Sequence, residues 1–247
     1  MITLCVTAQK GGVAKSTTAE ALVLGLRNKG YRVLGIDLDQ SANFTKYFIN
    51  EDFEKDAFDL ISGKAKISDV IRNDIIPGGN GLIYLPMFFD ANPGKLNELK
   101  NKLKPVEKNY DFCIIDTAPT TNKVALSALT VSDYVIVPTE PSNDCIDGCK
   151  STLQTIRDVR KNINNKLTLL GVLLVKYKEN YNAHKAVKTL LENQKIKLFK
   201  TTIRESQAIN NAKLLNESFF LKKYNTAKAV IDYHSFINEV LKGVKVS

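Results

Sequence analysis

The stretch Gln9-Lys10-Gly11-Gly12-Val13-Ala14-Lys15-Ser16-Thr17 decides the fold of this chain. An apolar run at 2–8 precedes it, and a segment at 17–29 with apolar residues at helical spacing follows it. Gly11 and Gly12 carry no Cβ, so their backbone N–H groups can turn inward and join the unpaired N–H groups at the start of the helix. A glycine-rich turn between a strand and a helix is the setting in which such a nest binds phosphate. The sequence therefore predicts a phosphate loop.

Two side chains of the loop suit a nucleoside triphosphate. We expect Lys15 to reach the β- and γ-phosphates as a point charge and Ser16 to ligate Mg²⁺ through its hydroxyl. Ala14 stands where the plain pattern has glycine, and a positive φ there would cost about 1 kcal/mol. The second lysine, Lys10, needs another target because Lys15 already serves the phosphates. The candidate nucleotide-binding residues are Lys10, Gly11, Gly12, Val13, Ala14, Lys15, Ser16 and Thr17.

The pattern Lys10-Gly11-Gly12-x-x-Lys15-Ser16 resembles the deviant Walker A motif of the ParA/MinD family of ATPases. In that family the extra lysine reaches across a dimer interface to the partner's nucleotide. The resemblance thus implies catalytic roles for Lys10 and Lys15, the cofactors ATP and Mg²⁺, and an ATP-dependent homodimer. The alternative is a glycine turn with a stray lysine.

Carboxylates follow two other predicted strands, at 31–36 and 112–115. Because parallel sheets bind ligands at the carboxyl ends of their strands, Asp39 is a candidate to orient or deprotonate the attacking water. Asp116 is a candidate Mg²⁺ ligand beside Ser16. Both segments resemble those of the family. After the residue that matches Asp39, the family often continues Pro-Gln-Gly-Asn, whereas this chain keeps Asn43 but has Gln40-Ser41-Ala42 before it. That departure bears on the water geometry and predicts slow hydrolysis. Ordinary acidic strand exits are the alternative.

Strands alternate with helices along the chain, which predicts an α/β fold with a doubly wound, mostly parallel sheet and helices on both faces, like P-loop NTPases. We expect one domain spanning 1–247. Further strands are expected at 82–85, 134–137, 168–175 and 196–199. Further helices are expected at 57–62, 67–72, 96–106, 122–130, 142–161, 181–193 and 227–241.

The formal net charge of +9 is concentrated in one half of the chain. Residues 1–149 hold 16 Lys/Arg and 19 Asp/Glu, whereas residues 150–247 hold 19 and 7, a net of +12. This asymmetry favours a polyanion partner for 150–247, although a solvated lysine-rich surface would look the same. The candidate DNA-binding residues are Lys185, Lys188, Arg204, Lys213, Lys222, Lys223 and Lys228.

The resemblance to small ParA-type proteins implies a DNA-partition ATPase. Mg-ATP would join two subunits that bind DNA without sequence preference, and a ParB-type centromere-binding partner would stimulate hydrolysis. The chain begins directly at the first strand, so we do not expect a sequence-reading extension. We expect a cytoplasmic, nucleoid-associated protein, with no signal peptide and no apolar run near the roughly 20 residues of a membrane span.

Three other functions remain open on the same scaffold. A MinD-like membrane-positioning ATPase needs an amphipathic tail, and only 243–247 follows the last helix, too short for a stable anchor. A weakly hydrolysing nucleotide-switch regulator would fit Ala14 and the altered 40–42 segment. A redox enzyme similar to the nitrogenase iron protein would need cluster cysteines near the switch loops, and Thr117-Ala118-Pro119-Thr120 contains none. Metabolic relatives in biotin and cobalamin pathways generally lack the signature lysine that Lys10 supplies. The four cysteines favour reduced thiols, although Cys145 and Cys149 have a spacing that could hold a metal.

Overall fold

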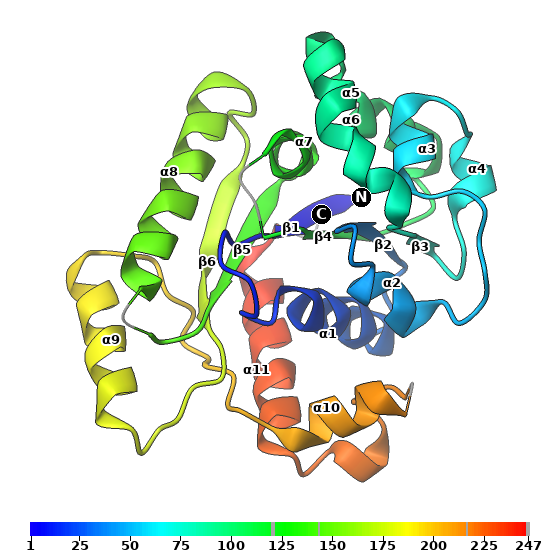
Figure 1. Ribbon diagram of the computed structural model, residues 1–247. Helices are drawn as coiled ribbons and strands as arrows, with labels where there is room; N and C mark the ends of the chain where they lie inside the picture. The colour runs from blue at the N-terminus through cyan, green and yellow to red at the C-terminus, as the bar shows by residue number, and fades with distance from the viewer. Residues whose placement is uncertain (120–121, 143, 216, 246–247) are drawn as a thin grey trace.

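A six-stranded parallel sheet forms the centre of the computed structural model, which describes residues 1–119, 122–142, 144–215 and 217–245 (Figure 1). The strand order is β3-β2-β4-β1-β5-β6, and every pair of neighbours is parallel. The sheet confirms the predicted parallel α/β fold. The strands are β1 (Ile2–Val6), β2 (Val33–Leu38), β3 (Ile75–Ile76), β4 (Phe112–Thr117), β5 (Tyr134–Thr139) and β6 (Thr168–Leu174).

The inner strands are apolar on both faces because helices cover both sides of the sheet. Every residue of β2 and β4 is buried. The register sets Val6, the last residue of β1, opposite Asp116 of β4, and sets Asp116 opposite Asp37 of β2. The phosphate loop and both acidic strand ends therefore meet at one edge of the sheet.

Eleven α-helices are found in the described part of the chain: α1 (Lys15–Asn28), α2 (Asn43–Phe48), α3 (Ala57–Ser62), α4 (Ile67–Val70), α5 (Leu85–Ala91), α6 (Glu98–Leu103), α7 (Lys123–Val131), α8 (Cys145–Asn162), α9 (Asn182–Asn193), α10 (Gln207–Leu214) and α11 (Lys228–Gly243). Short 3₁₀ turns complete the connections: η1 (Asn80–Tyr84), η2 (Pro93–Lys95), η3 (Lys104–Val106) and η4 (Lys222–Tyr224).

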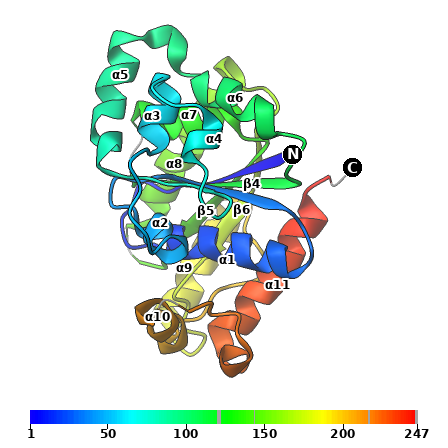
Figure 2. The ribbon, with the colours of Figure 1, turned by 90° about the vertical axis from the view of Figure 1, so that its right-hand side faces the viewer.

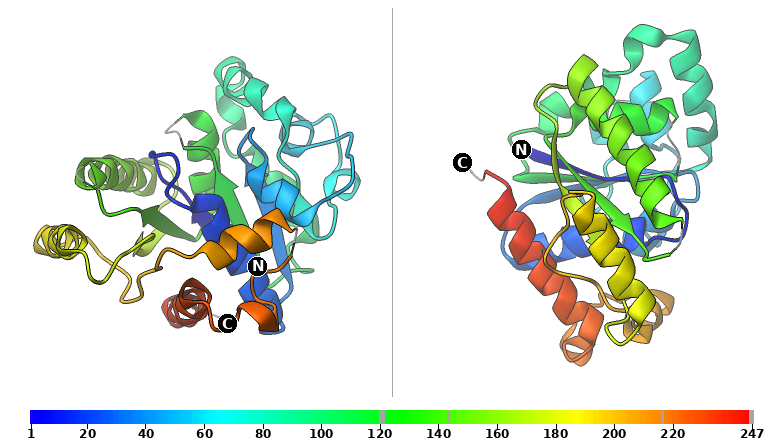
Figure 3. Two further views of the ribbon diagram at one scale, coloured as in Figure 1. Left: turned by 60° about the horizontal axis from the view of Figure 1, so that its bottom comes forward. Right: turned by 90° about the vertical axis from the view of Figure 1, so that its left-hand side faces the viewer.

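The helices form two layers, one on each face of the sheet (Figures 1 and 2). Helices α3 to α8 bury their apolar sides against one face, together with the strand residues that point there. Helices α1, α2, α10 and α11 cover the opposite face, where Phe44, Tyr233 and Phe236 are fully buried. Helix α9 packs beside the edge strand β6 through Leu191, which lies with Leu174 and Tyr177 (Figure 3).

Two expected strands are absent. The segment expected as a strand at 82–85 is instead the end of η1 and the start of α5. Pro86 sits in the first turn of α5, where its missing N–H costs nothing because no intrahelical partner exists there. Short apolar runs do not distinguish a strand from a buried helix.

The segment at 196–199 forms only a single bridge, from Leu198 to Val172 of β6. Beyond it the backbone N–H groups of Lys200 and Thr201 donate to the carboxylate of Glu239 on α11, at 2.8 and 3.0 Å. A side chain thus takes the hydrogen bonds that a longer ladder would have made. The two-residue edge strand β3 was not expected.

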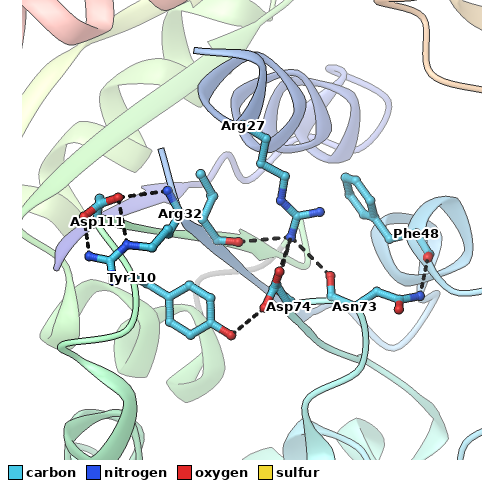
Figure 4. A network of polar contacts seen from close by, with 8 residues as sticks. Arg27, Arg32, Phe48, Asn73, Asp74, Tyr110 and Asp111 are labelled. Atoms are coloured by element: carbon cyan, nitrogen blue, oxygen red, sulfur yellow. Dashed lines mark hydrogen bonds and ion pairs between the residues drawn. The ribbon is translucent and has the colours of Figure 1, made fainter. Parts of the chain in front are cut away.

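A polar network ties edge strand β3 to the end of α1 (Figure 4). The Arg27 guanidinium donates to the backbone oxygens of Val33 and Asn73, at 3.0 and 3.2 Å, and lies 3.9 Å from the Asp74 carboxylate. The Tyr110 hydroxyl donates to the same carboxylate at 2.7 Å. Asn73 and Asp74 have positive φ, as side chains of this type tolerate. The network holds α1 from the end opposite the phosphate loop.

Candidate functional site

The phosphate loop has the backbone that its glycines predict. Gly12 has φ 75°, in the region that glycine enters without strain. Ala14 also lies there, with φ 56°, and is the N-cap of α1. The helix begins directly at Lys15, and Thr18 N donates to the Ala14 carbonyl at 2.9 Å. Ala14, which departs from the glycine pattern, thus has the strained positive φ that the sequence analysis anticipated.

Val13 is buried in the core under the loop, whereas Gly11 and Gly12 are exposed. Such an arrangement anchors the loop by one side chain and leaves its backbone open to a ligand. An added Cβ at Gly11 or Gly12 would meet no atom within 4 Å, so space inside the protein does not demand these glycines. Their lack of a side chain leaves room above the loop.

Lys15 and Asp116 form the buried floor of the site. Lys15 is only 6% exposed, and burial lowers the pKa of its ammonium while Asp116 and then Asp39 oppose that effect. Asp116 is fully buried, and neither of its carboxylate oxygens has a hydrogen-bond partner in the described part of the chain. Burial and the neighbouring Asp37 raise its pKa well above the usual range, although the adjacent Ser16 hydroxyl and the Lys15 ammonium oppose that effect. A buried carboxylate without partners is costly unless a cation completes it.

The turn after β2 carries the other acidic residues. Asp37 is buried and accepts hydrogen bonds from the backbone N–H and the hydroxyl of Thr45, at 2.9 and 2.7 Å. Burial nevertheless raises its pKa to about 6. Asp39 lies nearer the surface, accepts from Ser41 N at 2.9 Å and lines the cavity above the loop. Ala42, at the second departure from the family pattern, has φ 52° and caps α2.

A cavity of about 730 Å³ opens above the loop. From the amino-terminal half it is lined by the loop, by the turn at 39–43 and by the residues that follow Asp116. Its remaining wall comes from the carboxyl-terminal half, and sequence reasoning missed it. That wall consists of Val175, Lys176, Ile203, Arg204, Glu205, Ser206, Ile209, Asn210, Lys213 and Tyr233. The sequence assigned none of these residues to the nucleotide site, because only packing brings α10 and α11 to the loop.

Lys10 lies outside this cavity. It is exposed, and its ammonium donates to the Ser142 hydroxyl at 3.0 Å, in the segment after β5. The Lys10 ammonium therefore contacts the segment after β5 and does not line the cavity.

The seven candidate DNA-binding residues divide into two groups. Arg204 and Lys213 line the cavity, and their charges are paired: Arg204 with Asp232 at 2.6 Å, and Lys213 with Glu20 at 2.8 Å. The others lie on the outside, at α9, η4 and the start of α11, and Lys223 is paired with Glu217. Among described residues, no carboxylate pairs with Lys185, Lys188, Lys222 or Lys228.

Two negative observations bear on other functions. No helix within the described ranges combines the length and hydrophobicity that crossing a bilayer requires. Cys5, Cys113, Cys145 and Cys149 are all buried free thiols, and the described residues contain no cluster of three or more histidine, cysteine or acidic side chains suited to a metal.

The fold and the site define a protein of the P-loop NTPase class. The AAA-domain family matches residues 1–169. The sporulation initiation inhibitor protein Soj of Bacillus subtilis (strain 168) is 31% identical over 220 residues, covering 85% of this chain and 86% of Soj. The chain belongs to the ParA/MinD family of partition ATPases.

Two solved structures are similar over nearly the whole chain. A plasmid partition protein of Borrelia burgdorferi B31 bound to AMPPNP has a TM-score of 0.81 and 26% identity, covering 98% of this chain and 99% of that one. Cobyrinic acid a,c-diamide synthase of Mycobacterium smegmatis with bound ADP and magnesium has a TM-score of 0.86 and 25% identity, covering 98% and 94%.

Proposed function

We propose that this chain is a DNA-partition ATPase. Mg-ATP joins two copies, the pair binds DNA without sequence preference, and a ParB-type partner stimulates hydrolysis. Family membership supports this reading, as do the AMPPNP and the ADP with magnesium held by the two solved relatives. The protein would act in the cytoplasm, on the nucleoid.

The observation that carries the proposal is the unpartnered, fully buried carboxylate of Asp116 beside Lys15. Magnesium prefers oxygen ligands, and a cation there would satisfy a group that the protein itself leaves unsatisfied. Asp116 and Ser16 would hold Mg²⁺, directly or through water, and the ion would neutralise charge on the phosphates. Residues 11–17 would bind the phosphates through backbone N–H groups and Lys15.

Asp39 is proposed to position the attacking water. Its carboxylate lines the cavity, and Asp37 fixes the turn by accepting the Asp39 backbone N–H at 2.9 Å. The strained Ala42 and the Gln40-Ser41 pair give this turn its own shape, and hydrolysis is therefore proposed to be slow without a partner.

Lys10 is proposed to complete the pocket of the second copy. An exposed ammonium outside its own cavity is free to reach another subunit, because its hydrogen bond to Ser142 is a single exposed contact. Two nucleotides would then be enclosed between two copies.

The DNA surface is proposed to be the outward lysines. Lys222 begins η4 and Lys228 begins α11, the next element along the chain. Lys185 and Lys188 lie on α9. Arg204 and Lys213 are omitted from this surface, because carboxylates of the protein already neutralise their charges.

The test is binding of a random-sequence duplex in the presence of a non-hydrolysable ATP analogue, with ADP as the control. If 6–10 phosphates are neutralised, the association constant should fall about 10³–10⁵ between 50 and 200 mM salt. The double variant Lys222→Glu with Lys228→Glu should weaken DNA binding. Lys104→Glu, at an exposed lysine on η3 outside the proposed DNA surface, should not. A flat salt response, or equal binding with ADP, would contradict DNA partition. ATP-dependent sedimentation with anionic liposomes instead of DNA would favour membrane positioning.

A further inference from the structure

Lys213 of α10 reaches inward to the helix that follows the phosphate loop. Its ammonium lies 2.8 Å from the carboxylate of Glu20 and donates to the Thr17 hydroxyl at 3.0 Å. The ring of Tyr47 lies on another side, with its centroid 5.8 Å from the nitrogen. The side chain of Lys213 is therefore held against two consecutive turns of α1.

The direction of the contact with Thr17 is set by chemistry. An ammonium group has only donors, so the Thr17 oxygen must accept and its own hydrogen remains to be donated. Within the described residues, no acceptor takes that hydrogen. Thr17 follows Ser16 directly and lines the cavity together with Lys213. The arrangement leaves one hydroxyl donor available to a ligand oxygen in the cavity.

Glu20 keeps Lys213 in this position. Its side chain is 0% exposed, whereas that of Lys213 is 28% exposed at the cavity wall. Removing the cation partner of a fully buried carboxylate is strongly unfavourable, and Lys213 is the cation that pairs with Glu20. Tyr233 of α11 closes the same region, with its hydroxyl 3.3 Å from that of Thr18.

We propose that Lys213 is a positioning residue for the bound nucleotide: held by Glu20, it orients the Thr17 hydroxyl so that this group donates to a phosphate oxygen. The inference rests on the proposed function, since it assumes that the cavity binds a nucleotide. It assigns Lys213 to the nucleotide site and removes it from the DNA-contacting set. It also makes the position of α10, which lies in the basic half of the chain, depend on whether nucleotide is bound at the phosphate loop.

The test is a double-mutant cycle on the dissociation constant of ADP, measured by calorimetry. One change is Thr17→Val, which removes the hydroxyl and keeps the shape. The other is the pair Glu20→Gln with Lys213→Met, which removes the ammonium without leaving a buried charge. Lys104→Met, at an exposed lysine on η3 outside the cavity, is the matched control. Melting temperatures check that each variant is folded.

Each of the two changes should weaken ADP binding about tenfold, the value of one hydrogen bond to a charged group. All three substitutions together should also cost about tenfold, because Lys213 acts through Thr17. Independent effects would instead multiply to about a hundredfold, and that result would overturn the proposal. Lys213→Arg alone, which keeps a donor and the charge beside Glu20, should retain more affinity than the Met-containing pair; equal loss would count against it.

The failure of this inference can be told apart from failure of the proposed function. A wild-type chain that binds ADP, with the Glu20 and Lys213 pair variant binding it equally well, overturns the role of Lys213 alone. A wild-type chain that binds no ADP overturns the nucleotide site itself, and the inference with it.

Discussion

Asp116, at the end of β4, lies directly opposite Asp37 of β2 in the parallel register, and both carboxylates are buried. Thr45 satisfies one oxygen of Asp37, whereas both oxygens of Asp116 are left without hydrogen-bond partners in the described chain. Two neighbouring buried carboxylates disfavour ionisation of each other. A bound cation would therefore favour the ionised forms of Asp37 and Asp116 by offsetting the repulsion between them.

The first prediction concerns stability against pH in the absence of nucleotide and magnesium. Burial raises the pKa of Glu20 to about 7 and that of Asp37 to about 6, and it also raises the pKa of Asp116 well above its usual range. The folded chain therefore binds more protons than the unfolded chain above about pH 4, so the free energy of unfolding should fall as pH rises from 5 to 8. We expect a loss on the order of 2 kcal/mol, about 5 °C in Tm.

Asp116→Asn should reduce this pH dependence, because the amide is neutral throughout. Asp52→Asn, at an exposed carboxylate, is the control and should leave it unchanged. Thermal melts of the nucleotide-free protein at several pH values measure the effect. A Tm that rises between pH 5 and 8 in the wild type would contradict the assignment. Adding Mg²⁺ with ADP should weaken the dependence further, since the ion would hold Asp116 ionised.

The second prediction separates the two lysines of the loop. Lys15→Ala should abolish nucleotide binding, because the buried ammonium facing Asp116 and Asp39 is removed. Lys10→Ala should leave binding to one chain within about threefold, since Lys10 lies outside its own cavity, but should prevent ATP-dependent dimers. Calorimetry and light scattering measure the two quantities. Unchanged dimerisation of Lys10→Ala would exclude the role across the interface.

The third prediction concerns the water-positioning role of Asp39. Asp39→Ala should lower ATP hydrolysis at least about a hundredfold, the scale of a lost general base, while ATP binding persists. The dimer should then accumulate with ATP and be detected by size-exclusion chromatography. Glu51→Ala, at an exposed carboxylate outside the cavity, is the control. Unchanged hydrolysis in Asp39→Ala would show that another group positions the water.

The fourth prediction concerns backbone strain in the loop. Ala14 has φ 56°, so Ala14→Gly should relieve strain and stabilise the chain by up to about 1 kcal/mol, partly offset by the entropy of glycine in the unfolded state. Ala186→Gly, at an exposed position within α9, should destabilise by about 0.5–1 kcal/mol. Urea unfolding compares the two. Equal losses from both substitutions would mean that Ala14 carries no strain.

Much of the site could be predicted because its signals are local. The loop at 9–17 joins glycines, lysine and serine within one turn, and the acidic residues 39 and 116 follow apolar strands. The parallel architecture then requires that they meet at one edge. The segment at 82–85 could not be predicted in the same way, because four apolar residues suit a strand and a buried helix equally well. A segment as short as β3 has too few residues to show any period.

The sequence by itself determined the phosphate loop, the alternation of the strands β1, β2, β4, β5 and β6 with helices, and the edge at which the acidic residues lie, because each depends on neighbours within a few positions. Only the tertiary structure decided which basic residues turn inward. Lys213 and Thr17 are 196 positions apart, and they meet because the apolar sides of α1, α10 and α11 share one core. Charge counted along a chain does not reveal such a contact, since burial of a partner such as Glu20 depends on packing of the whole layer.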